Sequence, residues 1–154
     1  AKDHNLPKMS TIQNSYSLLH RAYEYGMSEV SLRENIGLLV YSPLAFGVLS
    51  GKYIGGKKPS DARVTLFPNY NRYSSPQSEK AVLEYQKIAN KNGLSLVEMS
   101  LAFVNQLPFV TSNIIGASKM SQLKENINSI NIDLSEEIIN EINEIHKIMP
   151  NPAP

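Results

Sequence analysis

The run Ile36-Gly37-Leu38-Leu39-Val40-Tyr41, followed by Ser42-Pro43, is the stretch that decides the fold of this 154-residue chain. Six successive residues without a charge predict a strand that is buried on both faces, as strands of parallel sheets are. Pro43 ends the strand, because proline has no N–H group to donate to a neighbouring strand. A parallel sheet needs helices on its faces, so the flanking sequence should alternate strands with helices.

The flanking sequence has this alternation. Two further short runs, residues 9–12 and 110–115, predict strands. Helices are predicted over residues 17–25, 28–35, 75–92, 96–106, 120–129 and 135–149. The clearest helix boundaries are Gly93, which follows one helix, and the capping-box sequence Ser95-Leu96-Val97-Glu98, which opens the next. We expect a single α/β domain over residues 1–154, with residues 150–154 as an extended tail.

Residues 46–74 form a long loop that is rich in Gly, Pro, Lys and Tyr and shows no period. Connections are usually about 4–6 residues long, so a loop of this length is expected to be functional or mobile. The segment from Gly47 to Lys52 superficially resembles a P-loop. It lacks the four residues that the motif needs between its glycines, and Tyr53 follows the lysine where Ser or Thr is required.

Composition excludes several classes of function. Fifteen Lys and Arg against fourteen Asp and Glu give a net charge of +1, without the basic excess of a nucleic-acid-binding domain. The absence of cysteine excludes a disulfide framework and a thiolate metal site, and it fits a reducing compartment such as the cytoplasm. No apolar run approaches the roughly 20 residues of a transmembrane helix, so membrane insertion is not expected.

The titratable residues form no recognisable catalytic or metal-binding set. Ser15 and Ser17 lie near His20 in sequence, but proximity in sequence does not make a catalytic triad. His146 comes four residues after Ile142 on a predicted helix and is expected to lie at the surface or at the edge of the core. No two carboxylates fall where a glycosidase pair or metal ligands would be expected. We therefore expect neither catalytic residues nor a metal site in this chain.

Polar or glycine-rich groups follow the three predicted strands. They are Gln13-Asn14, Tyr41-Ser42-Pro43-Leu44 and Gly116-Ala117-Ser118-Lys119. The carboxyl ends of parallel strands meet at one edge, where barrel enzymes bind ligands, and a helix N-terminus favours phosphate. The alternatives are structural: Ser118 as a helix cap, Lys119 as a solvated charge, and Tyr41 as an aromatic ring that covers the core.

Three segments carry a resemblance to a known family. Residues 41–53 (YSPLAFGVLSGKY) resemble the YSPLxxGxLxGKY segment of the aldo-keto reductases, and residues 115–126 (IGASKMSQLKEN) resemble their GAS…QLxEN segment. Residues 11–19 (TIQNSYSLL) are similar to their sixth barrel strand. The resemblance covers essentially the whole chain and is closest to the Tas-like and potassium-channel beta-subunit branch.

The resemblance implies a (β/α)8 TIM barrel that binds NADPH and reduces aldehydes or ketones. This chain would be its C-terminal portion, about strands 6–8 with their helices, since a whole barrel needs about 250 residues. Residues 46–74 would cover the cofactor. The family's catalytic Asp, Tyr, Lys and His come from earlier strands, so the chain would carry the cofactor-binding part without them.

The resemblance also implies roles for particular residues. Gln13 would bind the nicotinamide carboxamide, and Tyr41 would stack on the nicotinamide ring. The pyrophosphate would be lined by Ser42, Leu44, Gly47, Ser50 and Lys52, with Arg63 reaching a phosphate. Ser118, Lys119 and Gln122 would hold the 2′-phosphate side, with Glu125 and Asn126 near the adenine; Pro43 and Gly116 complete the expected NADP(H) site.

Two other functions stay open. In one alternative the chain is a non-catalytic module, built from a truncated barrel, that binds a nucleotide or regulates a partner. In the other it is a degenerate fragment without a function. In the enzyme reading the partner is a small-molecule carbonyl substrate. Open strand edges seek neighbours, so we expect self-association or packing against the missing barrel segments.

Overall fold

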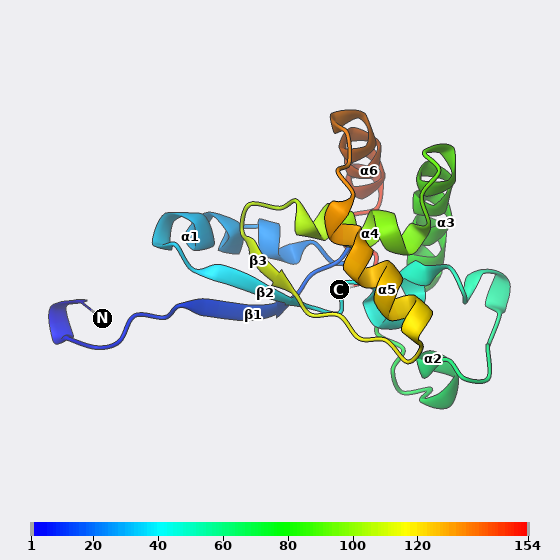
Figure 1. Ribbon diagram of the computed structural model, residues 1–154, viewed down its shortest axis with the longest axis horizontal. Helices are drawn as coiled ribbons and strands as arrows, with labels where there is room; N and C mark the ends of the chain where they lie inside the picture. Colours follow the sequence, from blue (N-terminus) through cyan, green and yellow to red (C-terminus); the bar gives the residue numbers. More distant parts are fainter. Residues whose placement is uncertain (1, 154) are drawn as a thin grey trace.

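A parallel sheet of three strands lies at the centre of the computed structural model, which describes residues 2–153 (Figure 1). The strands β1 (Thr11–Ser15), β2 (Gly37–Tyr41) and β3 (Val110–Asn113) are arranged in sequence order. β2 occupies the middle position, as its apolar sequence predicts. Within residues 2–153 the sheet is open, since β1 and β3 each keep one unpaired edge.

The two faces of the sheet differ in exposure. Leu38 and Val40 are fully buried on the face where α1 (Met27–Glu34) contacts β2. Leu39 and Tyr41, on the opposite face, are only partly buried. The prediction that this strand is buried on both faces is therefore wrong, because the described helices pack on one side of the sheet. The other side is an open surface.

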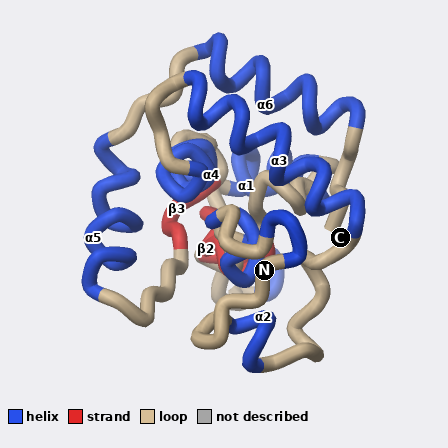
Figure 2. Tube along the Cα trace, turned by 90° about the vertical axis from the view of Figure 1, so that its right-hand side faces the viewer, coloured by secondary structure: helices blue, strands red, loops and turns tan. Residues whose placement is uncertain are grey.

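The remaining helices surround α4 (Leu96–Asn105), which packs against β3 and is the most apolar of the helices described. α3 (Pro76–Lys91) and α5 (Met120–Asn128) contact α4, and α6 (Glu136–Ile148) packs on α3 (Figure 2). α2 (Arg63–Leu66) is a single turn in the long loop. Short 3₁₀ turns cover Lys2–His4, Ala22–Glu24, Ala45–Ser50, Ile54–Gly56 and Ser129–Asn131.

Local signals place the start of α4 correctly. The Ser95 hydroxyl accepts a hydrogen bond from the Glu98 N–H at 3.0 Å, and the Glu98 carboxylate accepts one from the Ser95 N–H at 2.8 Å. This is the predicted capping box, which satisfies two amides that a helix start leaves unpaired. Ser75 caps α3 in a similar way, accepting from the Ser78 N–H at 3.0 Å.

The strand predicted at residues 9–12 is displaced to Thr11–Ser15 in the structure, so Gln13 lies inside β1 rather than after it. The helix predicted over residues 17–25 is wrong except for one 3₁₀ turn. Leu18 and Leu19 are fully buried here, and their carbonyl groups accept hydrogen bonds from Tyr85 Oη and the Ala153 N–H. Tertiary partners thus replace the hydrogen bonds of a helix.

The tail after α6 is folded back onto the protein, in contrast to the predicted extended segment. Pro152 and Ala153 are buried, and Ala153 is only 1% exposed. Asn151 has a φ of 47°, in the left-handed region, and two residues later the Ala153 N–H donates to the Leu19 carbonyl. Pro154, like Ala1, lies outside the described residues.

The long loop, residues 46–74, is named the flap below. It consists of short turns and irregular backbone, as its sequence predicts. Its last turn is held in the core by Tyr73, which is only 1% exposed. The Tyr73 and Phe46 rings pack edge-on, with their centres 4.9 Å apart. In residues 2–153 we find no helix with the length and apolarity needed to cross a membrane.

Candidate functional site

Gln13 and Tyr41 lie on the same face of the sheet. The parallel register pairs Gln13 with Leu39 and Ser15 with Tyr41. Paired residues of neighbouring strands, and residues two apart within a strand, point to the same side. This side is the open surface, where the Gln13 side chain is exposed and Tyr41 partly so. The structure therefore brings together the two residues assigned to the nicotinamide.

The backbone that follows β2 is strongly curved. Left-handed φ angles occur at Ser42 (56°), Ala45 (49°), Phe46 (57°), Gly47 (89°) and Gly51 (74°). Three of these five residues are neither Gly nor Asn, so the conformation carries strain of the kind that clusters at functional sites. Successive amides in such turns form concave sites that bind anions.

Lys52 folds back over this curved backbone. A Cβ atom built on Gly47 would lie 3.0 Å from both Cε and Nζ of Lys52, so glycine leaves room for the lysine as well as allowing the positive φ. The Ser50 hydroxyl donates to the Gly47 carbonyl at 2.7 Å and stabilises the turn. Lys52 Nζ also lies 5.4 Å from the centre of the Tyr53 ring. The predicted phosphate residues of this segment are thus neighbours.

The flap reaches the segment that follows β3. Lys119 Nζ is 3.0 Å from Asp61 Oδ2. A hydrogen bond from Lys119, with its positive charge, lowers the pKa of the Asp61 carboxyl. The guanidinium of Arg63, an exposed flap residue, lies 5.7 Å from the centre of the Phe46 ring. Residues from the ends of β2 and β3 are therefore joined through the flap.

Gln122 organises the start of α5. Its Oε1 accepts hydrogen bonds from the Ser118 N–H at 3.1 Å, the Ser118 hydroxyl at 3.2 Å and the Lys119 N–H at 3.2 Å. The alternative that Ser118 is the helix cap is wrong, because Lys119 occupies the N-cap position. Two exposed amides, a hydroxyl and an ammonium group meet here, and Gln122 and Asp61 are their present acceptors. A phosphate that replaced these acceptors would find donors of the kind that anions bind at helix N-termini.

Glu125 and Asn126 have structural partners instead of facing this donor set. Glu125 Oε1 accepts from the Ser95 hydroxyl at 2.7 Å, which links α5 to the start of α4. Asn126 is 5% exposed and its Nδ2 lies 3.5 Å from the Gly116 carbonyl oxygen. Their predicted place near an adenine ring stays a prediction.

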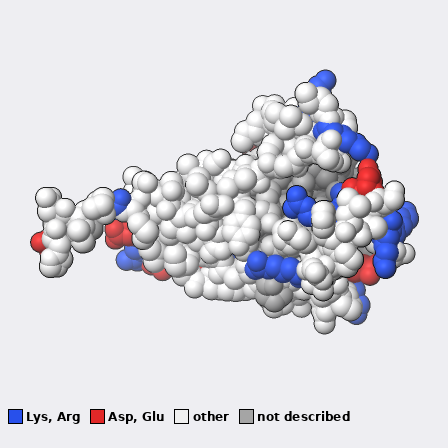
Figure 3. Space-filling model, turned by 90° about the horizontal axis from the view of Figure 1, so that it is seen from below, with Lys and Arg blue, Asp and Glu red and all other residues white. Residues whose placement is uncertain are grey.

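Positive charge is concentrated in the flap. It contains five cations, at positions 52, 57, 58, 63 and 72, against the single acid Asp61. Viewed from below, Lys and Arg side chains lie around a hollow at the end of the molecule that carries α2 and α5, with fewer Asp and Glu side chains among them (Figure 3). The net charge of +1 therefore conceals a local excess that suits an anionic ligand.

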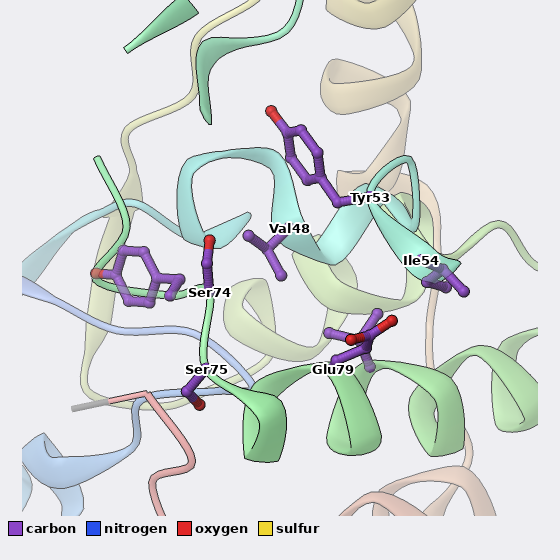
Figure 4. A pocket seen from close by; sticks show the side chains of 8 residues that line it. Val48, Tyr53, Ile54, Ser74, Ser75 and Glu79 are labelled. Atoms are coloured by element: carbon purple, nitrogen blue, oxygen red, sulfur yellow. The ribbon is translucent and has the colours of Figure 1, made fainter. Parts of the chain in front are cut away.

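A small cavity of about 100 Å³ lies between the flap and α3 (Figure 4). It is lined by Val48, Tyr53, Ile54, Tyr73, Ser74, Ser75, Glu79 and Val82. Glu79 Oε1 accepts a hydrogen bond from the Gly55 N–H at 3.0 Å, a flap contact that the sequence did not reveal. Sites for drug-sized ligands usually measure about 300–1,000 Å³, so this cavity is too small for a dinucleotide.

A buried ionic network was also missed. Arg21 is 7% exposed and binds both carboxylate oxygens of Glu24, at 2.7 and 3.0 Å, while the Tyr16 hydroxyl donates to the same carboxylate. Burial, followed by the charge of Glu24, raises the pKa of Tyr16 well above its usual value. Tyr16 has no exposed surface, so the network is structural. The described residues hold no group of three or more acidic, His or Cys side chains arranged to hold a metal.

Comparison with known proteins adds independent findings. The model of the aldo/keto reductase family matches residues 1–147. The chain is 50% identical over 154 residues to Protein tas of Escherichia coli (strain K12), covering 100% of this chain and 44% of that protein. It is 35% identical over 121 residues to a probable voltage-gated potassium channel subunit beta of Oryza sativa subsp. japonica, covering 75% of this chain and 37% of that protein.

The L-glyceraldehyde 3-phosphate reductase of Escherichia coli (strain K12) is 32% identical over 125 residues, covering 77% of this chain and 36% of the reductase. The chain thus spans less than half the length of each of these relatives.

Proposed function

Because this chain belongs to the aldo/keto reductase family, in the branch of Protein tas and the potassium-channel beta subunits, we propose that it is the cofactor-binding part of an NADPH-dependent reductase. Its substrates would be small aldehydes or ketones. One relative is named a reductase of an aldehyde phosphate, which supports this class of reaction. The absence of cysteine supports a cytoplasmic location.

The three strands would be strands 6–8 of an eight-stranded barrel. The unpaired edge of β3 supports this, since a hollow of about 320 Å³ lies beside it and is lined partly by Ile115, Ile127 and Ile130. Ile127 and Ile130 are 57% and 67% exposed, which is unfavourable for apolar side chains in water. Further barrel segments, or a second copy of the chain, would cover this edge and the open face of the sheet.

The observation that carries the cofactor proposal is the curved backbone of residues 42–51 with Lys52 folded over Gly47. The Lys52 ammonium group would bind a pyrophosphate together with amides of this segment, several of which now donate to carbonyl groups of the turn. Ser118 and Lys119 would supply a second set of donors for a 2′-phosphate by exchanging their hydrogen bonds to Gln122 Oε1 for bonds to the phosphate. Gln13 and Tyr41 share the open face of the sheet, where a nicotinamide would lie. The residues present therefore fit NADP(H).

When bound, NADPH supplies a hydride to the carbonyl carbon of the substrate. In the proposed mechanism the Gln13 carboxamide, which both donates and accepts hydrogen bonds, orients the nicotinamide amide. The Tyr41 ring, partly exposed on the open face of the sheet, would hold the nicotinamide by stacking. The flap excludes water from the site. The proton for the product alcohol would come from a residue outside these 154, as the family resemblance implies.

The proposal is tested by calorimetric titration of the complete gene product with NADPH and with NADH, which measures the affinity for each cofactor. We expect tighter binding of NADPH. Tyr41→Ala should weaken it about tenfold or more, as loss of ring stacking does, whereas Tyr41→Phe should bind nearly as well as wild type. No binding by the wild type would refute the proposal. Binding without oxidation of NADPH in the presence of aldehydes would favour the alternative of a nucleotide-binding or partner-regulating module.

A further inference from the structure

The last four described residues bridge two parts of the protein that are distant in sequence. The Pro152 carbonyl accepts hydrogen bonds from two hydroxyl groups, Ser75 Oγ at 2.8 Å and Ser78 Oγ at 3.1 Å. On the other side, the Ala153 N–H donates to the Leu19 carbonyl at 3.2 Å. One short segment thus contacts both the start of α3 and the chain that leaves β1.

Asn151 strengthens the second attachment. Its Oδ1 accepts from the Arg21 N–H at 2.6 Å, and its Nδ2 donates to Tyr25 Oη at 3.2 Å. Arg21 is itself held to α6 through a 2.9 Å hydrogen bond to Asn143 Oδ1. The segment is therefore fixed firmly on the β1 side.

The two attachment points have a direct relation to the proposed site. Leu19 follows β1, the strand that carries Gln13, while Ser75 comes directly after the last flap residue, Ser74. We propose that residues 150–153 hold the end of the flap in position relative to β1, and so control how long NADP(H) stays bound. This inference rests on the proposed function for its ligand, and on the hydrogen bonds above for its geometry.

The other flap contacts explain why this attachment matters. The Asp61–Lys119 pair has side chains 66% and 62% exposed, and the Glu79–Gly55 contact also lies at the surface. Exposed contacts of this kind contribute little and exchange readily with water. By contrast, Ser78 is fully buried and Pro152 is buried. The outer flap can therefore open while its end stays fixed beside Tyr73 and Ser75.

Two substitutions isolate the contact in the complete gene product. Ser78→Ala removes one donor to Pro152, together with the 2.8 Å contact between the two serine hydroxyl oxygens. Ser75 keeps the helix cap, because its hydroxyl still accepts from the amide of residue 78. Ser75→Asp keeps an acceptor for the cap but places a carboxylate against the Pro152 carbonyl. Removal of residues 150–154 is the third variant. Ser100→Ala is the matched control, because the Ser100 hydroxyl is also buried and also donates to a carbonyl, that of Leu96 at 2.6 Å, but inside α4.

The experiment measures the rate of NADPH dissociation by stopped-flow fluorescence, together with hydrogen exchange of the flap. We expect Ser78→Ala to raise the dissociation rate about fivefold, equivalent to one lost hydrogen bond, with little change in the association rate. Exchange over residues 56–74 should accelerate in all three variants. Ser100→Ala should change neither quantity, even if it lowers the melting temperature.

The outcomes separate this inference from the proposed function. If the wild type binds no NADPH, the proposed function fails, and flap exchange still tests whether the tail positions the flap. If the wild type binds NADPH but the tail variants release it no faster than Ser100→Ala does, the inference is overturned. Equal flap exchange in the wild type and in Ser78→Ala would also overturn it.

Discussion

Lys119 Nζ lies 3.0 Å from Asp61 Oδ2, so an ion pair closes the flap onto the segment that follows β3. Both side chains are largely exposed, and exposed ion pairs are weak and sensitive to salt. A weak contact suits a flap that must open to admit a ligand and close around it. Lys119 is also one of the residues assigned to the 2′-phosphate, so the ligand and the flap would meet at the same ammonium group.

Asp61→Asn should therefore increase the dissociation rate of NADPH a few-fold, with little change in the melting temperature. The carboxyl has a lowered pKa because Lys119 donates to it, so the pair persists across the neutral range and is lost only in acid, below the usual Asp value. Stopped-flow measurements at low and high salt check this, since the effect should shrink with salt. Glu29→Gln, which breaks an exposed 2.7 Å pair with Arg33 on α1, should leave release unchanged.

Gly47→Ala should weaken NADPH binding more than Gly55→Ala. Both glycines have left-handed φ angles, of 89° and 71°, so each substitution should cost about 1–2 kcal/mol of stability. At position 47 the added methyl carbon would lie 3.0 Å from Cε and Nζ of Lys52. At position 55 the added methyl carbon would have no neighbouring atom within 4 Å. Calorimetric titration and urea unfolding of both variants separate the two effects. Equal affinities would show that the position of Lys52 is unimportant.

The protein should lose stability as the pH falls below about 6.5, the ordinary pKa of histidine. Burial, followed by the charge of Arg72, lowers the pKa of His20, and burial, followed by the charge of Arg21, lowers that of His146. Between the lowered value and 6.5 the unfolded chain binds more protons, so acid favours unfolding.

His20→Gln and His146→Gln should each reduce this loss, as measured by the urea midpoint between about pH 7.5 and about pH 5.5. His4→Gln, at an exposed position, is the control. A wild-type midpoint that stays constant over this interval would contradict the expectation.

Lys57 and Lys58 should accelerate NADPH association without affecting its release. Both are exposed, and neither forms a salt bridge with an acidic side chain among residues 2–153. Together with the other flap cations they attract an anion over several ångströms, which raises its association rate. Salt screens this attraction, so the effect should shrink as the salt concentration rises. The double variant Lys57→Gln/Lys58→Gln should associate several-fold more slowly at low salt. Lys8→Gln/Lys147→Gln removes the same charge elsewhere and should associate nearly as fast as wild type.

Signals confined to a few neighbouring residues predicted structure well. The capping box of Ser95 and Glu98 depends on residues three apart, and α4 begins where it indicates. The run from Ile36 to Tyr41 depends on its own apolarity, and it forms the central strand. Residues 41–53 carried the resemblance that the family comparison confirmed. Local hydrogen bonds and side-chain spacing suffice for such features.

Features that depend on distant partners were not predictable in the same way. Residues 17–25 have a plausible helical pattern, but Tyr85 and Ala153 supply hydrogen bonds that favour another conformation. The tail was expected to be extended because nothing in residues 150–154 shows that Ser75 and Ser78 would bind it.

By itself the sequence determined the α/β class, the central strand, the principal helices and the family, because short-range apolar patterns and motifs encode them. Only the tertiary structure decided that Gln13 and Tyr41 share a face, that Lys119 meets Asp61, and that Pro152 meets Ser75. The physical reason is the same in each case. The energy of these contacts depends on distances between residues far apart in the chain, and those distances exist only after the sheet and helices have packed.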